Sequence, residues 1–306
     1  MNTVSQAVRP LPTTIAEYLL QLRQALSSAG ADRAMIQDAL YDAEEYLRSE
    51  LAEQAGKSEA EVIAGVAGSY GAPEEVAEIY RETEVTVTRA LRPPLPPKRR
   101  SWWGRFFGVA ADPRTYGALF YLLLAVVTGT FYFSWVVTGT ALSLGLLVLI
   151  IGVPLLVLFL GSVRLLSLVE GRLLEVLLGV RMPRRPTYLE RDQGWLARIA
   201  EMFKDARTWT TMLYFLLMLP LGVAYSVVFT TLLSLALGFL LSPLGWFFDN
   251  AFSLNMGPWT VAGDAPWVLP LLSLLGVLML FATLHLARAV GHVHGLMAKH
   301  LLVRLD

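Results

Sequence analysis

Two long stretches of this chain contain almost no charged residues. None of the residues from Tyr116 to Val163 is charged, and only Asp249 and Asp264 are charged between Thr208 and Ala287. A helix needs about 20 mostly apolar residues to cross roughly 30 Å of hydrocarbon. Only 16% of all residues are charged, whereas soluble proteins have about a quarter. The sequence therefore predicts an integral membrane protein.

The basic residues indicate how the chain is oriented. All 25 Lys and Arg fall within residues 9–114, 164–207 and 288–304. Loops rich in Lys and Arg stay in the cytoplasm, so an even number of crossings must separate successive basic blocks. We therefore predict a multi-pass protein whose N- and C-termini are both cytoplasmic. The predicted spans are about 116–137, 141–163, 208–231 and 265–288.

The apolar stretch 232–248, LLSLALGFLLSPLGWFF, allows two interpretations. A fifth crossing there would place Arg288 and the basic residues after it outside the cell, against the charge rule. We therefore favour a half-helix or an outer-leaflet segment. A break is expected at Ser242-Pro243, because proline cannot continue the hydrogen-bond ladder of a helix.

One segment of the sequence occurs twice, 93 residues apart. DPRTYGALFYLLL begins at Asp112, and DARTWTTMLYFLL begins at Asp205. The same offset aligns Trp102 with Trp195, Arg105 with Arg198, Arg114 with Arg207, Tyr121 with Tyr214, Gly129 with Gly222, Tyr132 with Tyr225, and Gly145 with Gly238. An offset of 124 aligns Arg164 with Arg288. We predict two repeated hairpins, related by an axis along the membrane normal because two spans per copy preserve orientation.

The repeated turn suits the start of a helix at the membrane surface. Asp112 is a good N-cap, and Pro113 fits the first helical position. Arginine and tryptophan near the ends of spans anchor helices among lipid headgroups. We expect this role for Trp102, Arg105, Asp112, Arg114, Trp195, Arg198, Asp205, Arg207, Arg164 and Arg288. A ligand site built by both copies is the alternative.

Two amphipathic stretches follow the predicted returning spans. They are RLLSLVEGRLLEVLLG, which begins at Arg164, and LARAVGHVHGLMAKHLL, which begins at Leu286. Both alternate polar and apolar faces, a pattern typical of helices in the membrane interface. We expect them to lie along the inner membrane surface.

Residues 13–88 have the pattern of a small soluble helical domain. Apolar stripes run through Ile15, Leu19, Leu22 and Leu26, and through Ile36, Leu40, Leu47 and Leu51. Thr14 with Glu17, and Ser58 with Glu61, have the spacing of capping boxes. We place a disordered N-terminus at 1–12, a proline-rich basic linker at 89–101, and the duplicated membrane domain at 102–306.

The N-terminal residues are strongly acidic. Residues 1–88 hold 6 basic and 15 acidic side chains, a net charge of −9, and the remainder of this neutral chain carries +9. Opposite net charges attract, so the two parts are expected to be electrostatically complementary. Candidate partner-binding residues are Asp42, Glu44, Glu45, Glu74 and Glu75. A merely solvated face, or docking on the protein's own basic residues, are the alternatives.

Motifs for catalysis are not found in the sequence. Cysteine is absent, which excludes thiolate chemistry, and P-loop, GxSxG and HExxH patterns do not occur. His285 and His292 are seven residues apart, about 10 Å along a helix, too far to share a metal. We expect interfacial polar histidines, no catalytic residue, no metal and no cofactor. Buried acids or bases are not expected in the membrane either, which argues against an ion-coupled transporter.

Two families resemble parts of the chain. EYLLQLRQAL, DALYDAEEYLRSEL and GAPEEVAEIYRE resemble the HAAS-type domain, a small cytoplasmic helical module that precedes membrane domains in bacterial signalling proteins. Residues 105–303 resemble the sensor membrane domain found ahead of some bacterial histidine kinases. The likeness lies in the D-x-R-T-W/Y turn, the G-x-x-Y within the span and the arginine-containing exit helices. Together they imply an all-α protein of the bacterial inner membrane.

These resemblances imply a non-catalytic regulatory role. We expect the protein to couple a membrane or envelope signal to a cytoplasmic signalling or regulatory protein through its N-terminal domain. The lipid bilayer is its other expected partner, small residues in the spans favour a homodimer, and no nucleic acid is expected. An accessory or lipid-handling subunit of a transport complex is the alternative. A membrane enzyme with its site at the histidine-rich end is a third.

Overall fold

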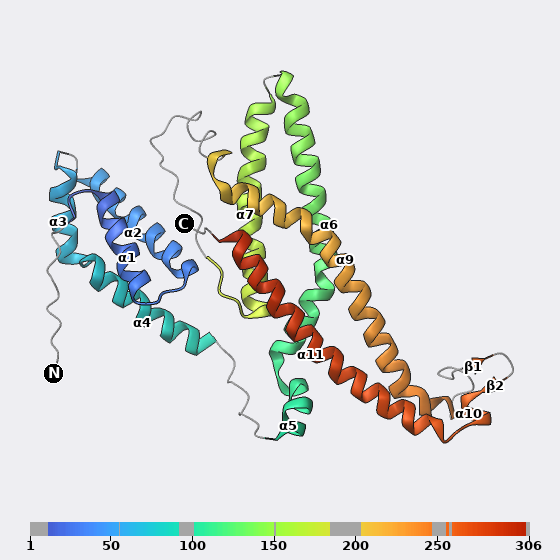
Figure 1. Cartoon of the computed structure of the whole chain (residues 1–306). Helices are drawn as coiled ribbons and strands as arrows, with labels where there is room; N and C mark the ends of the chain where they lie inside the picture. Colours follow the sequence, from blue (N-terminus) through green and yellow to red (C-terminus); the bar gives the residue numbers. More distant parts are fainter. Residues whose placement is uncertain are drawn as a thin grey trace. The chain divides into compact units, whose positions relative to one another are not determined.

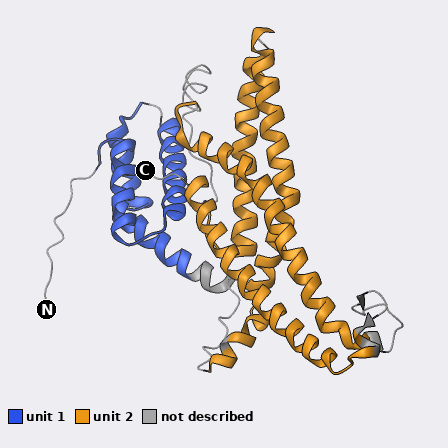
Figure 2. Ribbon diagram, turned by 45° about the vertical axis from the view of Figure 1, so that its right-hand side comes forward, with its two compact units in different colours: residues 1–95, 183–198 blue, residues 96–182, 199–306 orange. Residues whose placement is uncertain are grey.

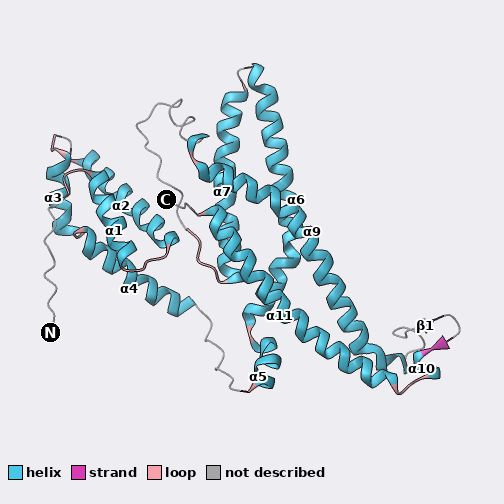
Figure 3. Cartoon of the chain, in the orientation of Figure 1, coloured by secondary structure: helices cyan, strands magenta, loops and turns pink. Residues whose placement is uncertain are grey.

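The computed structural model describes residues 12–54, 56–91, 101–149, 151–183, 203–246, 255–256 and 259–303. It divides the chain into two compact units, residues 1–95 with 183–198 and residues 96–182 with 199–306 (Figure 2). Helices make up almost all of the described elements (Figure 3). The prediction of an all-α protein is therefore confirmed. The predicted 1–12 terminus lies almost wholly outside the described residues.

Four helices lie in the described residues of the first unit, 12–54 and 56–91 (Figure 1). They are α1 (Ile15–Ser28), α2 (Arg33–Glu53), α3 (Glu59–Ser69) and α4 (Pro73–Leu91). Thr14 caps α1 by accepting a hydrogen bond from the Glu17 amide, and Ser58 with Glu61 forms the complete capping box at α3. The predicted capping box is therefore complete at Ser58, whereas at Thr14 the Glu17 carboxylate accepts from the Thr13 amide instead.

The turn before α4 is tied to α1. Gly71 has φ +110°, a conformation that suits glycine because it has no Cβ. The hydroxyl of Tyr18 donates to the Gly71 carbonyl oxygen at 2.9 Å. Burial raises the pKa of Tyr18 above its usual value, with smaller contributions from Tyr70 and from the Glu74 charge. Tyr18 therefore stays a neutral donor that holds this turn against the core.

The predicted apolar stripe of α2 is confirmed at Leu47 and is otherwise at the edge of the core. Met35, Ala39 and Ala43 are the other positions buried in that core, whereas Ile36, Leu40 and Leu51 are partly buried and pack against it. Neighbouring residues point in directions about 100° apart on a helix. Ala39 and Ala43 at the centre of this face allow neighbouring helices to pack closely. A prediction based on Ile and Leu positions alone does not include them.

The second unit is built around two helical hairpins (Figure 1). The first follows α5 (Trp102–Phe107) and the 3-10 turn η1 (Gly108–Ala111), and the second carries a small cap at its tip. The remaining elements are α6 (Pro113–Gly145), η2 (Leu146–Leu149), α7 (Gly152–Leu178), α9 (Ala206–Leu241), η3 (Ser242–Trp246), the antiparallel pair β1 (Asn255–Met256) and β2 (Trp259–Thr260), α10 (Val261–Asp264) and α11 (Val268–Leu302).

The four long helices of this unit are each long and apolar enough to cross a membrane. They run well beyond the predicted spans. In particular, α7 continues to Leu178 and α11 continues to Leu302. The expectation that residues 164–179 and 286–302 form separate helices on the inner surface is therefore wrong. Their apolar faces pack against the other long helices instead, so the helix does not need to end where its charge-free stretch ends.

The first part of the ambiguous stretch, residues 232–241, belongs to one long helix. α9 continues without interruption to Leu241, and the chain then enters η3 at Ser242. The predicted break at Ser242-Pro243 is confirmed, but a separate half-helix is not formed. Residues 247–248 lie outside the description.

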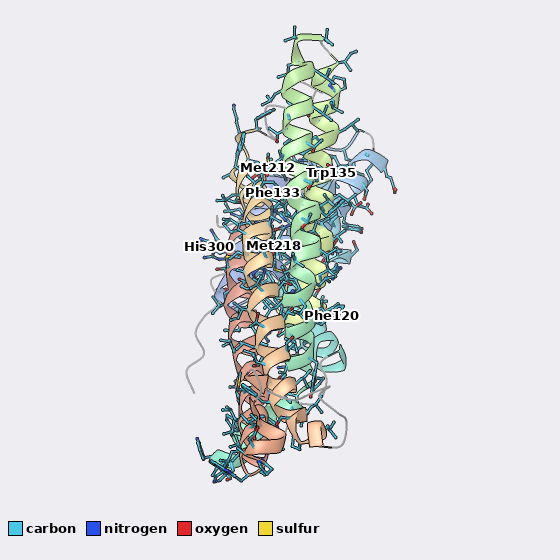
Figure 4. All side chains as sticks on the ribbon, turned by 90° about the vertical axis from the view of Figure 1, so that its right-hand side faces the viewer. Phe120, Phe133, Trp135, Met212, Met218 and His300 are labelled. Atoms are coloured by element: carbon cyan, nitrogen blue, oxygen red, sulfur yellow. The ribbon has the colours of Figure 1, made fainter. Side chains whose placement is uncertain are left out.

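The two hairpins meet where α6 crosses α9. Gly129 lies against the backbone of Met218, and Gly222 lies against the backbone of Ala125. Residue numbers therefore rise along one helix as they fall along the other. Figure 4 agrees: Met212 lies near the height of Phe133, and Met218 lies lower, between the heights of Phe133 and Phe120.

This crossing corrects one expectation from the repeat. The sequence predicted hairpins that point the same way about an axis along the membrane normal. Instead, the hairpins extend in different directions from the crossing (Figure 1). Glycine decides this geometry, because a Cβ atom at either position would overlap the opposing backbone.

We predict that Gly222→Ala destabilises the membrane unit. Its new Cβ would overlap the carbonyl oxygen of Ala125, and overpacking of this kind costs about 1–3 kcal/mol. Thermal unfolding of the full chain in detergent measures the effect. Gly238→Ala in the same helix is the matched control, because nothing lies within 4 Å of its new Cβ. Equal melting temperatures for the two variants would contradict the close crossing.

Candidate functional site

A buried carboxylate lies between the hairpins. Glu170 of α7 has no exposed surface. Its Oε1 accepts hydrogen bonds from the hydroxyls of Tyr121 at 2.5 Å and Tyr214 at 2.9 Å, and its Oε2 accepts one from Tyr132 at 3.0 Å. A buried charge is costly unless it is hydrogen-bonded or paired. Three hydroxyl donors from α6 and α9 meet that need.

A buried imidazole completes the cluster from the other side. His294 of α11 is 1% exposed. Its Nε2 lies 2.9 Å from the Tyr121 hydroxyl and 3.2 Å from the Tyr214 hydroxyl, and its Nδ1 lies 3.3 Å from the Tyr225 hydroxyl. The Tyr121 and Tyr214 hydroxyl oxygens are 3.3 Å apart. The acid and the base thus share the same two tyrosines. We call these six residues the junction cluster.

The junction cluster follows the sequence repeat. Tyr121 and Tyr214 are equivalent at the offset of 93, as are Tyr132 and Tyr225. Glu170 and His294 are equivalent at the offset of 124. Each of the last two contacts both central tyrosines and the outer tyrosine of its own copy. Within the junction cluster the two copies differ at one position, where the first copy supplies the acid Glu170 and the second copy supplies the base His294.

Apolar side chains enclose the junction cluster. Phe215 is fully buried and stacks on the Tyr132 ring with centroids 4.4 Å apart. Leu122 and Met218 are also fully buried in the same core. Such surroundings keep water away and strengthen the electrostatic interactions inside.

This cluster contradicts the expectation that the membrane helices bury no acid or base. Glu170 and His294 lie beyond the charge-free stretches, in parts of the chain that the sequence assigned to the membrane surface. The expectation that all histidines are interfacial is wrong for His294. His292 and His300 are exposed, and His285 lies 3.0 Å from the Phe106 carbonyl oxygen. The tyrosine repeat was a usable signal, since a phenol recurring inside an apolar helix needs a polar partner.

Two ion pairs connect the hairpins reciprocally. Arg164 of α7 contacts Asp205 at the start of α9, with 2.9 Å between Nη2 and Oδ2. Arg288 of α11 contacts Asp112 at the start of α6, with 3.1 Å between Nη1 and Oδ2. Each returning helix therefore holds the first turn of the other hairpin. Both aspartates also cap their helices by accepting a hydrogen bond from the amide two residues on.

These pairs change the interpretation of four predicted anchors. Asp112, Asp205, Arg164 and Arg288 join the two copies, so a role as lipid anchors alone is insufficient for them. Trp102 is exposed, and Arg114 and Arg207 are half-buried. Trp195, Arg198 and the side chain of Arg105 lie outside the described residues.

Among the aromatic residues at the hairpin starts, the repeat is reproduced in detail. Tyr116 donates to the Ala110 carbonyl oxygen at 2.8 Å, and Trp209 donates to the Phe203 carbonyl oxygen at 2.9 Å. Both donors are six residues after their acceptors. Different rings thus make the same contact in the two copies.

The predicted partner-binding acids divide into two groups. Asp42 accepts from the Tyr80 hydroxyl at 3.1 Å, Glu44 pairs with Arg48 at 3.0 Å, and Glu75 accepts from the Ala72 amide at 3.1 Å. These three stabilise the first unit itself. Glu45, Glu74 and Glu75 are exposed, and a role of the five acids in binding an external partner stays a prediction.

Metal-binding groups of three or more His, Asp or Glu do not occur among the described residues. The junction cluster brings together one acid and one base, with four phenols around them. Chemically it can hold and redistribute protons within a closed hydrogen-bond network.

We predict that Arg164→Gln lowers the stability of the membrane unit by about 1–3 kcal/mol, because it leaves the Asp205 carboxylate largely buried without its cation. Adding Asp205→Asn should recover part of the loss, since asparagine caps a helix about as well as aspartate. Thermal unfolding of the four forms of this double-mutant cycle measures the coupling.

The control for this cycle is Arg172→Gln. Arg172 pairs with Glu175 within one helix at 2.7 Å, and half of the Arg172 side chain is exposed. Ion pairs within one helix contribute about 0.3–0.5 kcal/mol, and the Glu175 side chain is as buried as that of Asp205, so the comparison isolates the link between hairpins. If Arg172→Gln and Arg164→Gln had equal effects, the pair between the hairpins would have no special role.

Comparison with known proteins supports the sensor resemblance. A family model described as "Putative sensor" matches residues 121–302, a region that contains the whole junction cluster. Searches of curated proteins and of solved structures gave no match. The likeness of the first unit to the HAAS-type domain stays a prediction. The match covers more than half of the 306 residues of the chain, so the chain belongs to the Sensor family.

Proposed function

We propose that the protein is a non-catalytic membrane sensor that couples a membrane or envelope signal to a cytoplasmic partner. In this proposal it resides in the bacterial inner membrane, with its first unit in the cytoplasm. Its second unit receives the signal, and its first unit binds a signalling or regulatory protein. Membership of the Sensor family supports the sensing role.

The observation that carries this proposal is the reciprocity of the joint between the hairpins. Asp112 at the start of α6 is held by Arg288 of the second hairpin, and Asp205 at the start of α9 is held by Arg164 of the first. Between these pairs, the junction cluster uses side chains from all four long helices. A change in one hairpin therefore changes the contacts of the other, as a two-state element requires.

The chain connection gives a route to the first unit. Residues 92–100 join α4 to the segment that leads through α5 and η1 to α6. The residue that precedes α6 is Asp112, the partner of Arg288. Movement at this pair would be transmitted along the chain to the first unit.

Charge supports a basic partner for the first unit. Its acidic excess is large, and Glu45 and Glu74 are exposed. Complementary charge raises association rates and selects among partners. The transport-accessory alternative is favoured by one observation, because the polar residues of the junction cluster face one another within the long helices.

We predict that a cytoplasmic protein co-purifies with the full chain from native membranes and is lost when residues 1–88 are deleted. Glu45→Lys with Glu74→Lys should also abolish its capture, because charge reversal repels a basic surface. Glu82→Lys, an exposed carboxylate of α4 outside the candidate set, is the matched control. Quantitative mass spectrometry measures the capture. Capture that is unchanged by the double reversal would exclude charge-based docking.

Coupling requires a second result. Asp112→Asn keeps the helix cap but weakens the pair with Arg288, so the amount of captured partner should change although residues 1–88 are intact. Glu175→Gln, on α7 but away from the joint, should have no effect. If Asp112→Asn also had none, the first unit would bind its partner independently of the membrane unit, and the sensor proposal would fail.

A further inference from the structure

The possible protonation states of the junction cluster can be compared by counting its hydrogen-bond donors and acceptors. Suppose that Glu170 is ionised and His294 is neutral with its proton on Nε2. Tyr121, Tyr214 and Tyr132 then donate to the carboxylate, and Nε2–H donates to the two central phenol oxygens. The Tyr225 hydroxyl donates to Nδ1. Every polar atom has a partner at the observed distances, so hydrogen bonding alone permits this state.

The net charge of the cluster disfavours the state with ionised Glu170 and neutral His294. That state leaves one uncompensated negative charge among apolar side chains, within helices long enough to span a membrane, where ionised groups are expensive. The hydrogen-bonding groups that face Glu170 and His294 come from α6 (Tyr121 and Tyr132) and α9 (Tyr214 and Tyr225). All four are phenols, which supply no positive charge.

The nearest arginines on the same helices are already committed. Arg164 and Arg288 each lie six residues before their cluster member, about 9 Å along the helix, and each is held by an aspartate. Arg172, two residues after Glu170, pairs with Glu175. Arg181, after α7, is half-buried and has interactions of its own.

We propose that Glu170 and His294 form a binding site for a single proton, shared between the two hairpins through Tyr121 and Tyr214. With that proton the cluster is neutral overall. This inference concerns the membrane unit alone and does not depend on the signalling role.

The geometry allows two arrangements of the shared proton. In one, the Glu170 carboxyl donates to a central tyrosine, that tyrosine donates to Nε2, and Nδ1–H donates to Tyr225. In the other, the carboxyl proton has passed to the tyrosine oxygen while the tyrosine's own proton has passed to Nε2. This leaves a carboxylate and an imidazolium bridged by phenols. Atoms and charge balance, and neither form leaves a net charge.

The site makes the stability of the membrane unit depend on pH in two directions. An unfolded chain binds no proton on this pair above about pH 6.5, one between about pH 4.3 and 6.5, and two below about pH 4.3. The folded protein holds one throughout. Stability rises with pH where the unfolded state binds more protons and falls where it binds fewer. The contribution of the pair is therefore greatest between those limits and declines on both sides.

Single substitutions separate the acidic decline from the alkaline decline in the dependence of stability on pH. With Glu170→Gln, only the imidazole titrates, so stability is lost as the pH falls below about 6.5 and is flat above it. With His294→Gln, only the carboxyl titrates, so stability is lost as the pH rises above about 4.3 and is flat below it. The double variant removes the contribution of the pair. Each decline changes the unfolding equilibrium by up to about tenfold per pH unit.

The experiment is thermal unfolding of the full chain in detergent from pH 4 to pH 9, with every profile compared with that of the double variant. The matched controls are Glu175→Gln, which removes a carboxylate already paired with Arg172 on α7, and His292→Gln, which removes an exposed imidazole of α11. They should keep the wild-type profile. A wild-type profile parallel to that of the double variant, or single variants with identical profiles, would overturn the proposal.

A second readout uses wild-type protein and therefore survives any folding failure of the variants. Infrared spectroscopy distinguishes a carboxylic acid from a carboxylate, and ¹⁵N spectra distinguish an imidazolium from a neutral ring. Between pH 5 and pH 8 the protein should show either a buried carboxylic acid or a buried imidazolium whose signal does not change with pH. The presence of neither would show that the cluster carries the ionised acid alone, and the site would be rejected.

Discussion

The membrane unit depends on a carboxylate that apolar helices alone cannot hold. Glu170 is fully buried in α7 and takes its hydrogen bonds from tyrosines of α6 and α9. If the hairpins separated, the carboxylate would lose donors within hydrocarbon, where replacements are not available. Hydrophobic burial gives little selectivity between helices in a bilayer, because lipid is as apolar as leucine. The polar cluster and the close glycine crossing therefore specify which helices meet, and in which orientation.

Duplication explains why the cluster is closed. Each copy brings a central tyrosine, an outer tyrosine and one residue on the returning helix, so the two copies together form a ring of hydrogen bonds. If both returning helices carried glutamate, two acids would compete for the same two phenols and repel each other. A histidine at one of the two positions supplies a group that can act as donor, acceptor or cation. The departure from symmetry is what makes the symmetric arrangement chemically stable.

The ion pairs follow the same exchange between copies. Arg164 of the first hairpin pairs with the aspartate that starts the second, and Arg288 of the second pairs with the aspartate that starts the first. An arrangement of this kind links the start of α6, which leads back to the first unit, to the position of α11. The first unit, with its separate core and acidic surface, has the form of a module that reads such a change. This interpretation rests on the proposed function.

The sequence by itself determined the class of protein, its four long apolar helices, the helix caps and the duplication. These features follow from local chemistry. The uncharged stretches, the N-cap residues and the repeated segment can all be recognised without knowing which helices are in contact. Tertiary structure alone decided that Arg164 pairs with Asp205 and not with Asp112, that α6 and α9 cross in opposite senses, and that Glu170 and His294 are buried. Periodicity shows that a helix has an apolar face but not which partner covers it. From sequence alone, Glu170 is consistent with the polar side of an amphipathic helix. Only the contacts with tyrosines of α6 and α9 show that it is buried.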